Sequence, residues 1–472
     1  MKILPLKNDP STHAGRLSWL INRNFALVTI GGAISGLGDA VYGQMINLWL
    51  IQKVLGSNAW GPLAMSAFGL FAALPGFILG PWAGVFVDRW VHRRTMMIIN
   101  MINALLMGVL ILVTGSIPLP WHLSPLFIVG FLCLEILLLS ICGQFSNPAS
   151  DGLFGQIVPK RSLIRAKGVS QILNAPAALV GPLLGTFLYF TVGMLWGLVL
   201  NAFSFVVWLL TLWVIRVHPG QGSVQKMKQK RFWPEFVSGL RFSFKNRAIR
   251  IFILSLVILN LGTGLLNPVS VFFLKSNLHA DLSSLGLFTT IGSAGSILGY
   301  LVFGCLAMRI GLKRLLYGSL LGMGILQIIF SRLSDWRPAL VITFMFSAVS
   351  GALNIVSTAL LIGETPNSLI GRVSSVMSTL TNISSTIAGM LGGYLASVAL
   401  VALHWHILGT GFGKFDTIYA GAGILFFLSG IYTLAALRGV TIETSMQTET
   451  SGEETSVQSP ARPSPSTTSP NM

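Results

Sequence analysis

Acidic residues, and charged residues in general, are scarce in this sequence. Only 10% of the 472 residues are charged and 53% are hydrophobic, whereas about 25% of a typical soluble domain is charged. The chain has 14 Asp and Glu residues against 31 Lys and Arg residues, a net charge of +17. So little polar surface excludes a soluble nucleic-acid binder, and so many apolar residues exclude disorder over most of the length. The composition indicates an integral membrane protein.

Cysteine is equally scarce, and several catalytic motifs are absent. Cys133, Cys142 and Cys305 lie in apolar runs without paired spacing, so neither a disulfide framework nor a zinc site is expected. The sequence has no GxxxxGK[ST] loop for ATP phosphates and no HExxH cluster. No nucleophile–base arrangement is visible either. We therefore expect no cofactor, no metal and no enzymatic activity.

Twelve apolar runs follow the first residues of the chain. Each is close to the roughly 20 residues that a helix needs to cross a bilayer. They predict an all-α integral membrane protein with twelve transmembrane helices. The runs lie at about 25–52, 60–87, 95–117, 123–147, 167–191, 194–215, 249–274, 283–307, 313–331, 338–362, 373–401 and 415–437.

The basic residues predict how these helices are oriented. If the N-terminus is cytoplasmic, all but five of the Lys and Arg residues fall on the cytoplasmic side. The five exceptions are Lys53, Lys275, Arg332, Arg337 and Lys414. Because cytoplasmic loops carry an excess of Lys and Arg, we expect an even number of spans. Both termini are then cytoplasmic in a multi-pass protein of the cell membrane.

The chain is expected to divide into five segments. A cytoplasmic N-terminal segment, 1–24, precedes a six-helix bundle at 25–216. A basic central loop at 217–248 leads to a second six-helix bundle at 249–438. The tail, 439–472, is rich in Ser, Thr and Pro, and we expect it to be disordered and cytoplasmic.

The central loop contains a short amphipathic pattern. Phe236, Leu240 and Phe244 recur every four residues, with Arg241 and Lys245 beside them. This spacing predicts an amphipathic helix on the inner membrane surface. A solvated basic linker is the alternative, because the apolar stripe is short.

The two halves of the chain resemble each other at a constant offset. Between the second and third runs the chain reads GVFVDRWVHRR, and between the eighth and ninth it reads GCLAMRIGLKRL. The matched pairs are Gly84 and Gly304, Arg89 and Arg309, Arg93 and Lys313, and Arg94 and Arg314. Duplicated halves are typical of transporters that bind substrate between two units. We therefore expect two pseudo-symmetric six-helix bundles.

The first of these segments resembles the loop motif of the major facilitator superfamily, the twelve-helix secondary transporters. Val91 and His92 replace the usual Gly and Arg, and Met308 replaces the acid in the second copy. The resemblance implies a cytoplasmic gate in which Asp88 latches the two halves, while a set of charges that only fixes topology is the alternative. The gate residues would be Gly84, Asp88, Arg89, Arg93, Arg94, Gly304, Arg309, Gly311, Lys313 and Arg314.

Other passages resemble the branch of this family that contains macrolide-type efflux pumps and the enterobactin exporter. They are SGLGDAVYGQ, the segment 147–171, FWPEFVSGLRF and PNSLIGRVSS. The sequence GPLLG, with Gly181, Pro182 and Gly185, is similar to the Gly-Pro motif of exporters, although Thr186 stands where a second Gly is usual. The resemblance implies export rather than import.

Two acidic residues are expected in the middle of the membrane. Asp39 lies in the first run and Glu135 in the fourth, with no base in any run to pair with them. A low-dielectric environment favours the neutral form of a carboxyl group. Such a group can bind and release protons as a cavity alternates between the two faces, and can compete with a cationic substrate. The alternative is an acid that stays protonated and hydrogen-bonded to a neighbour.

Seven amide side chains are candidates for the wall of a central cavity. Each could equally join two helices by a hydrogen bond, which is a common role for amides in membranes. The seven are Gln44, Asn47, Gln144, Asn174, Asn260, Asn267 and Asn354.

The sequence thus predicts a proton-coupled secondary transporter that exports small amphipathic or cationic compounds by alternating access. One alternative is an exporter of an endogenous metabolite such as a siderophore, or a lipid translocator. A transporter-like ligand sensor is the alternative from another class. The expected partners are a small-molecule substrate and the lipid bilayer, with no nucleic acid, and the expected state is a monomer.

Overall fold

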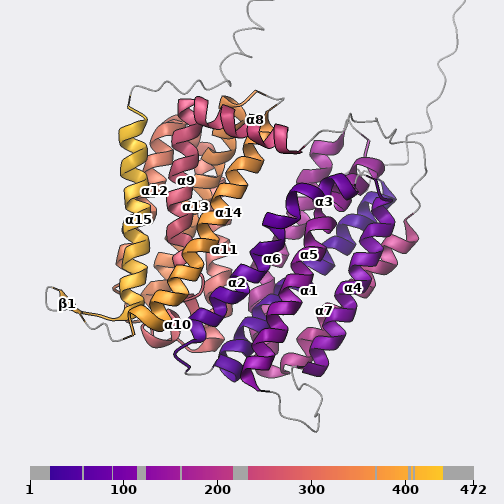
Figure 1. The fold of residues 1–472 in the computed structure, drawn as a ribbon, viewed down its shortest axis with the longest axis horizontal. Helices are drawn as coiled ribbons and strands as arrows, with labels where there is room; N and C mark the ends of the chain where they lie inside the picture. The colour runs from indigo at the N-terminus through magenta and orange to yellow at the C-terminus, as the bar shows by residue number, and fades with distance from the viewer. Residues whose placement is uncertain are drawn as a thin grey trace, which may run out of the picture.

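The computed structural model describes residues 22–55, 58–87, 89–113, 124–159, 162–215, 232–366, 369–401, 405–407 and 410–438. Two bundles of helices stand side by side (Figure 1). Within the described residues the exception to helix and loop is a short antiparallel hairpin, β1 (Trp405–Ile407) and β2 (Thr410–Phe412). The predicted all-α fold is confirmed, and the hairpin is an addition that the sequence did not predict.

The first bundle contains seven α-helices and one π-helical turn within the described residues. They are α1 (Arg23–Trp49), the π-helix η1 (Leu50–Leu55), α2 (Gly61–Ile78), α3 (Gly80–Val87), α4 (His92–Val113), α5 (Pro125–Ile157), α6 (Leu163–Thr191) and α7 (Met194–Val214). Helices α2 and α3 together form the single run expected at 60–87. Pro75 interrupts the hydrogen-bond ladder just before the break at Leu79.

The second bundle has the same plan. It is built from α9 (Arg247–Leu266), α10 (Ser270–Ser276), the 3-10 turn η3 (Leu282–Ser284), α11 (Leu285–Ile310), α12 (Leu312–Phe330), α13 (Trp336–Glu364), α14 (Ile370–Tyr394), the π-helix η4 (Leu395–Ala399) and α15 (Lys414–Ala436). One further helix, α8 (Phe232–Lys245), lies across one end of this bundle (Figure 1).

Side-chain caps set where several of these helices begin. Asn22 accepts a hydrogen bond from the Phe25 N–H at the start of α1, and Asn246 accepts bonds from Ala248 and Ile249 at the start of α9. Such caps satisfy N–H groups that have no partner inside the helix. Gly311 joins α11 to α12 with a φ of 86°, a conformation that favours glycine.

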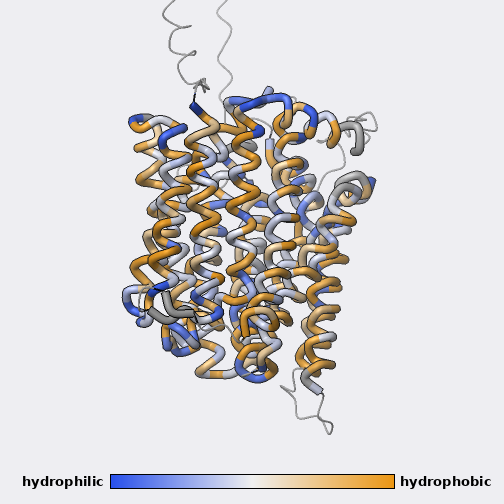
Figure 2. The backbone as a smooth tube through the Cα atoms, turned by 60° about the vertical axis from the view of Figure 1, so that its left-hand side comes forward, coloured by the Kyte–Doolittle hydropathy of each residue, from blue (hydrophilic) through white to orange (hydrophobic). Residues whose placement is uncertain are grey.

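Eleven of the described helices are long and apolar enough to cross a membrane. Helix α14 is as long, at 25 residues, but is rich in Ser and Thr. It packs between α9 and α2 inside the assembly, so it is the twelfth span. Apolar residues cover most of the helix length, and hydrophilic residues gather at the two ends (Figure 2). The predicted twelve-helix architecture is confirmed.

The two bundles are pseudo-symmetric in their packing. The pairs α1–α6, α1–α7, α4–α7 and α2–α5 of the first bundle correspond to α9–α14, α9–α15, α12–α15 and α11–α13 of the second. Residues 91–100 and 311–320 also share the same order of exposed, half-buried and buried positions. The sequence repeat therefore reflects a repeat in structure.

Glycines allow the central helices of each bundle to approach closely. A Cβ atom added to Gly181 would lie 2.5 Å from the Cβ of Ala40, and one added to Gly185 would lie 2.7 Å from the carbonyl oxygen of Val41. In the second bundle, Gly264 of α9 makes the corresponding close contact with Ser385 of α14. Small residues at such crossings are a main source of helix association in membranes.

We predict that Gly185→Ala destabilises the protein by about 1–3 kcal/mol, because the new methyl group meets backbone atoms of α1. The matched control is Gly168→Ala on the same helix, where an added Cβ has no atom within 4 Å. Thermal unfolding in detergent should show a lower Tm for the first variant alone. Equal Tm values for the two variants would contradict the close contact.

Candidate functional site

A cavity of about 1420 Å³ lies between the two bundles. The first bundle contributes α1, α2, α3 and α5 to its wall. The second contributes α14, the end of α9, and Phe236 of α8. Asp151, near the end of α5, also lines it and forms an ion pair with Lys167 at 2.6 Å.

The wall of the cavity has two chemically different sides. Helix α14 presents hydroxyl and amide groups, whereas α2 presents Met65, Phe68, Leu70 and Phe77 together with glycines and alanines. The polar residues of α14 on the wall are Ser374, Ser375, Ser378, Thr379, Asn382, Ser385 and Thr386. A solute with a polar edge and an apolar face would find partners on both sides.

The polar side of α14 is the main feature that the sequence reasoning missed. Its residues recur at intervals of three or four, so they share one face of the helix. A hydropathy average over a whole span hides such a stripe. A search for Ser, Thr and Asn at helical spacing within 374–386 would have found it.

The end of the cavity away from α8 is closed by contacts between the bundles. On one side, the Ser66 hydroxyl of α2 donates to the Gly389 carbonyl of α14 at 2.8 Å, and the Leu63 N–H donates to the Ser397 hydroxyl at 3.1 Å. A Cβ atom on Gly393 would collide with Pro62 and Ser66. Helices α2 and α14 therefore touch along their backbones here.

Helices α6 and α11 close the other side of the same end. The Thr290 and Ser293 hydroxyls of α11 donate to the carbonyls of Leu179 and Ala178, each at 3.0 Å. A Cβ atom on Gly286 would lie 2.8 Å from the Pro182 carbonyl oxygen. The cavity thus extends toward α8, as far as Asp151 of α5 and Ser374 of α14, and is closed at the opposite end.

The Gly-Pro motif of α6 lies at this junction. Gly181 and Gly185 face α1, and the Pro182 carbonyl faces Gly286 of α11. The motif therefore lets α6 pack against its own bundle and against the other bundle at the same level. Larger side chains would separate these helices.

Glu135 of α5 is buried within the first bundle. Its side chain is 1% exposed, and the Tyr42 hydroxyl of α1 donates to its Oε1 atom at 3.1 Å. Its other oxygen, Oε2, has no hydrogen-bond partner among the described residues. A buried carboxylate with one oxygen left without a donor is costly, and a protonated carboxyl group is much less so. The neighbouring residue Ile136 lines the cavity, and Glu135 itself does not.

Asp39 lies on a different face of α1. It is exposed, and Asn201 of α7 lies within hydrogen-bonding reach of its carboxylate. Asp39, Gly43 and Asn47 are four residues apart and share one helix face, and Asn47 lines the cavity. Asp39 therefore lies about two turns from Asn47, nearer to the α8 end, and is itself not among the residues that line the cavity.

Three of the seven candidate amides lie on the cavity wall: Asn47, Gln144 and Asn267. Asn147, which was not a candidate, also lines it. The Gln144 side chain lies near Gly76 and Gly80, whose lack of side chains leaves room for it.

The other four candidate amides are not among the residues that line this cavity, and each makes a hydrogen bond within its own bundle. Gln44 donates to the Thr186 hydroxyl at 3.1 Å and joins α1 to α6. The remaining three donate to the carbonyl of the residue four positions earlier, which is the usual local alternative for a polar side chain in a helix. These bonds are Asn174 to Ser170, Asn260 to Leu256 and Asn354 to Ser350.

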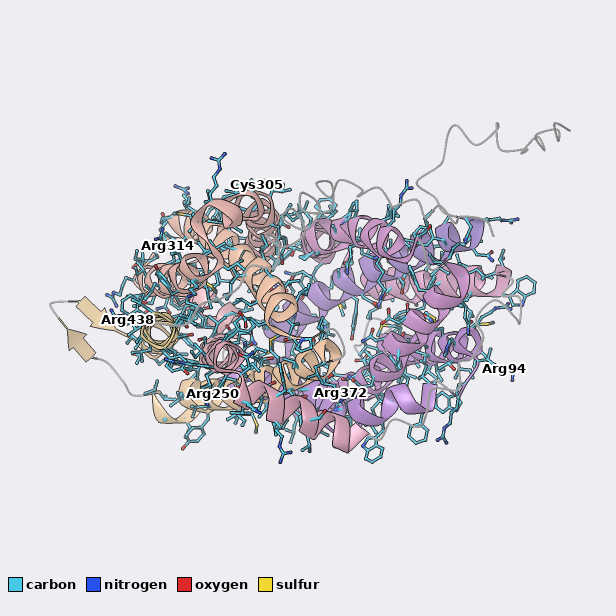
Figure 3. The ribbon with its side chains drawn as sticks, turned by 90° about the horizontal axis from the view of Figure 1, so that it is seen from above. Arg94, Arg250, Cys305, Arg314, Arg372 and Arg438 are labelled. Carbon is cyan, nitrogen blue, oxygen red and sulfur yellow. The ribbon has the colours of Figure 1, made fainter. Side chains whose placement is uncertain are left out.

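The first copy of the loop motif is described except for Asp88, which lies outside the described residues. Gly84 is in α3, and Arg89 is exposed in the turn that follows. Arg93 donates to the carbonyls of Leu212 and Trp213, both at 2.7 Å. It therefore caps the end of α7 in its own bundle, where a cation also interacts favourably with the helix dipole. Arg94 projects from the outer edge of the same bundle (Figure 3).

The second copy of the motif occupies the equivalent turn of the other bundle. Arg309 and Arg314 are exposed, and Lys313 is half-buried. Gly304 faces Ile355 of α13, and Gly311 forms the turn with positive φ. In the view from above, Arg314 lies in the second bundle, on the side of the molecule opposite to Arg94 (Figure 3).

Known proteins resemble this chain in sequence and in fold. Multidrug resistance protein MdtG of Salmonella typhimurium (strain LT2) is 25% identical over 391 residues, which are 81% of this chain and 90% of that protein. A bacterial homologue of the iron transporter ferroportin in its inward-facing state superposes with a TM-score of 0.68 and 16% identity, covering 88% of this chain and 98% of that one. A bacterial homologue of ferroportin in its outward-facing state superposes with a TM-score of 0.54 and 14% identity, covering 88% of this chain and 99% of that one.

One family model matches both halves of the chain. It is the model of the Major Facilitator Superfamily, which matches residues 28–264 and again residues 252–467. This agrees with the loop motif, the twelve helices and the paired bundles, and it confirms the predicted family. The chain belongs to the Major Facilitator Superfamily and is a multi-pass membrane transporter rather than an enzyme.

Proposed function

We propose that this transporter exports small amphipathic or cationic compounds in exchange for protons, by alternating access. The observation that carries the proposal is the cavity between the bundles, which extends toward α8 and is closed at the other end. The similarity to a multidrug resistance protein supports drug efflux as its use. The α8 end would be cytoplasmic, because the basic loops of the chain gather there.

Alternating access requires that the closed end can open at modest cost. The contacts that close it are neutral hydrogen bonds from hydroxyl groups and close backbone packing. A neutral hydrogen bond contributes roughly 1 kcal/mol net. A few such bonds can be exchanged for others as the two bundles rock. The higher TM-score with the inward-facing homologue supports assigning this structure to the inward-open state.

Proton coupling would use the two intramembrane acids in different ways. Asp39 is exposed and lies about two turns from Asn47 of the cavity wall, so it would meet protons and cationic substrates that enter from the α8 end. Glu135 is shut inside the first bundle, with Tyr42 as its donor. Since Tyr42 follows Asp39 by one helical turn, a change in the charge of one acid alters the field at the other. We infer that Glu135 holds a proton in the state shown.

The remaining parts of the proposal follow from this mechanism. The transporter would lie in the cell membrane with both ends of the chain in the cytoplasm. It would act without a bound cofactor, because the proton gradient supplies the energy. Its partners would be the transported compound and the surrounding lipid, and a monomer contains a complete cavity.

A pair of acid variants tests the coupling. In cells, the protein should lower the accumulation of a fluorescent cationic dye, and a protonophore should abolish this effect. We predict that Glu135→Gln lowers proton-driven export at least tenfold, because the site can no longer release a proton, and that Asp39→Asn does the same. Asp281→Asn, which neutralises an exposed acid outside the cavity, should export normally. Full export by both intramembrane variants would refute proton coupling through these residues.

Removing the Tyr42 hydroxyl tests its bond to Glu135. Tyr42→Phe removes the hydroxyl that donates to the Glu135 carboxyl group and keeps the ring. Because a hydrogen-bond donor acts differently on the two protonation states of a carboxyl group, the pH at which export is half-maximal should shift. The control is Tyr189→Phe, which removes a hydroxyl that donates to Gln52 at 2.7 Å in the same bundle. A shift of the same size in both variants would contradict the specific role of Tyr42.

A further inference from the structure

Helix α8 lies across the ends of the second bundle instead of spanning the membrane (Figure 1). It crosses at the level where hydrophilic residues gather at this end of the molecule (Figure 2). Gly239 and Ser243 form its buried side. Residues Val237, Arg241, Phe244 and Lys245 on the opposite side are exposed, and in a membrane they would lie at the level of the lipid headgroups.

The exposed side of α8 combines apolar and basic side chains. Val237 is 53% exposed and Phe244 is 46% exposed. Arg241 and Lys245 are exposed on the same side. Successive members of this set are four, three and one residues apart in the sequence. At 3.6 residues per turn they therefore lie within roughly one third of the helix surface. We refer to these four residues as the α8 surface.

The two bases of the α8 surface lie one helical turn apart. Like charges at this spacing repel each other and weaken a helix slightly unless an anion lies nearby. Within the described part of the chain, neither base has an ion pair. Arg250, whose guanidinium donates to the Phe244 carbonyl at 3.3 Å, adds a third base at the same place. The patch is therefore complementary to an anion.

The buried side of α8 is attached to the wall of the cavity. The Arg372 guanidinium, at the start of α14, donates to the Ser238 hydroxyl at 2.9 Å. A Cβ atom on Gly239 would lie 2.8 Å from the Arg372 carbonyl oxygen, and Phe236 lines the cavity itself. Arg372 is seen beside α8 when the molecule is viewed from this end (Figure 3). A displacement of α8 would therefore move the start of α14.

We propose that the α8 surface binds the headgroups of anionic phospholipids and thereby stabilises the arrangement in which the cavity is open toward α8. Val237 and Phe244 would enter the boundary of the acyl chains while Arg241 and Lys245 bind phosphate oxygens, as in other interfacial helices. The lipid then holds α8 at the membrane surface. Through Ser238 and Gly239 it also holds the first turn of α14. This inference does not depend on the direction of transport or on its coupling to protons.

Lipid binding is tested with the whole protein in nanodiscs. Spin-labelled phosphatidylglycerol should associate in preference to phosphatidylcholine, and Arg241→Gln/Lys245→Gln should reduce this preference by about fivefold for each base removed. Lys275→Gln/Arg337→Gln removes two exposed bases from the opposite end and is the matched control. Glycerol 3-phosphate in the buffer, which has the headgroup chemistry without acyl chains, should not compete.

The effect on the cavity is measured by thiol labelling. Ser378→Cys places a reporter on the cavity wall, in a chain that also carries Cys305→Ser, since Cys133 and Cys142 are buried. Phosphatidylglycerol should raise the labelling rate several-fold compared with phosphatidylcholine. The rise should vanish in Arg241→Gln/Lys245→Gln and persist in the control pair. Ser238→Ala should retain lipid binding and lose the rise.

Any of four results would overturn the proposal. The first is that the lipid preference or the rise in labelling is absent, or that it persists in Arg241→Gln/Lys245→Gln. The second is that the control pair Lys275→Gln/Arg337→Gln loses the lipid preference to the same extent. The third is that glycerol 3-phosphate competes with the lipid for binding. The fourth is that the Ser238→Ala protein responds to lipid as fully as the parent, which would refute the link to α14.

Discussion

Two helix crossings, α2 on α14 and α6 on α11, join the bundles. Because both crossings lie at one end of the molecule, they determine which end of the cavity is closed. Both crossings lie away from α8 and both rely on glycine, at Gly393 and Gly286. Hydroxyl groups of one bundle donate to carbonyls of the other across each crossing. Because these contacts stop halfway along the helices, the space beyond them remains open.

This kind of junction suits a moving part. A glycine contact has no long side chain to repack, and a hydroxyl in a helix can return to the carbonyl of its own preceding turn. The Ser66 and Ser293 hydroxyls already have this second acceptor within reach. Each lies within hydrogen-bonding distance of a carbonyl of the other bundle and of the carbonyl four residues earlier in its own helix. Opening would therefore leave few polar groups without a partner in the membrane, where such groups cost several kcal/mol.

Much of this organisation could be predicted from the sequence. The twelve spans follow from apolar length, and the paired bundles follow from two copies of one loop motif. The charges of that motif also place the family. What a motif does not give is distance, so the bonds of Arg93 to the end of α7 were unforeseen. The same limit explains why Gln44, Asn174, Asn260 and Asn354 were candidates for the cavity wall but do not line it. The sequence does not tell whether an amide side chain finds a hydrogen-bond partner nearby. The polar side of α14 was missed because its apolar neighbours mask it in any average.

The central claim is that the cavity opens to one face and then to the other, under the control of Glu135. Pulsed electron–electron distance measurements test it most directly. One spin-label pair, Gly168→Cys and Gly371→Cys, spans the α8 end of the two bundles, and a second pair, Thr191→Cys and Ser276→Cys, spans the other end. Between acidic and alkaline buffer the two distances should change in opposite directions, and Glu135→Gln should abolish both changes. Distances that stay constant, or that change in the same direction, would contradict alternating access coupled to this residue.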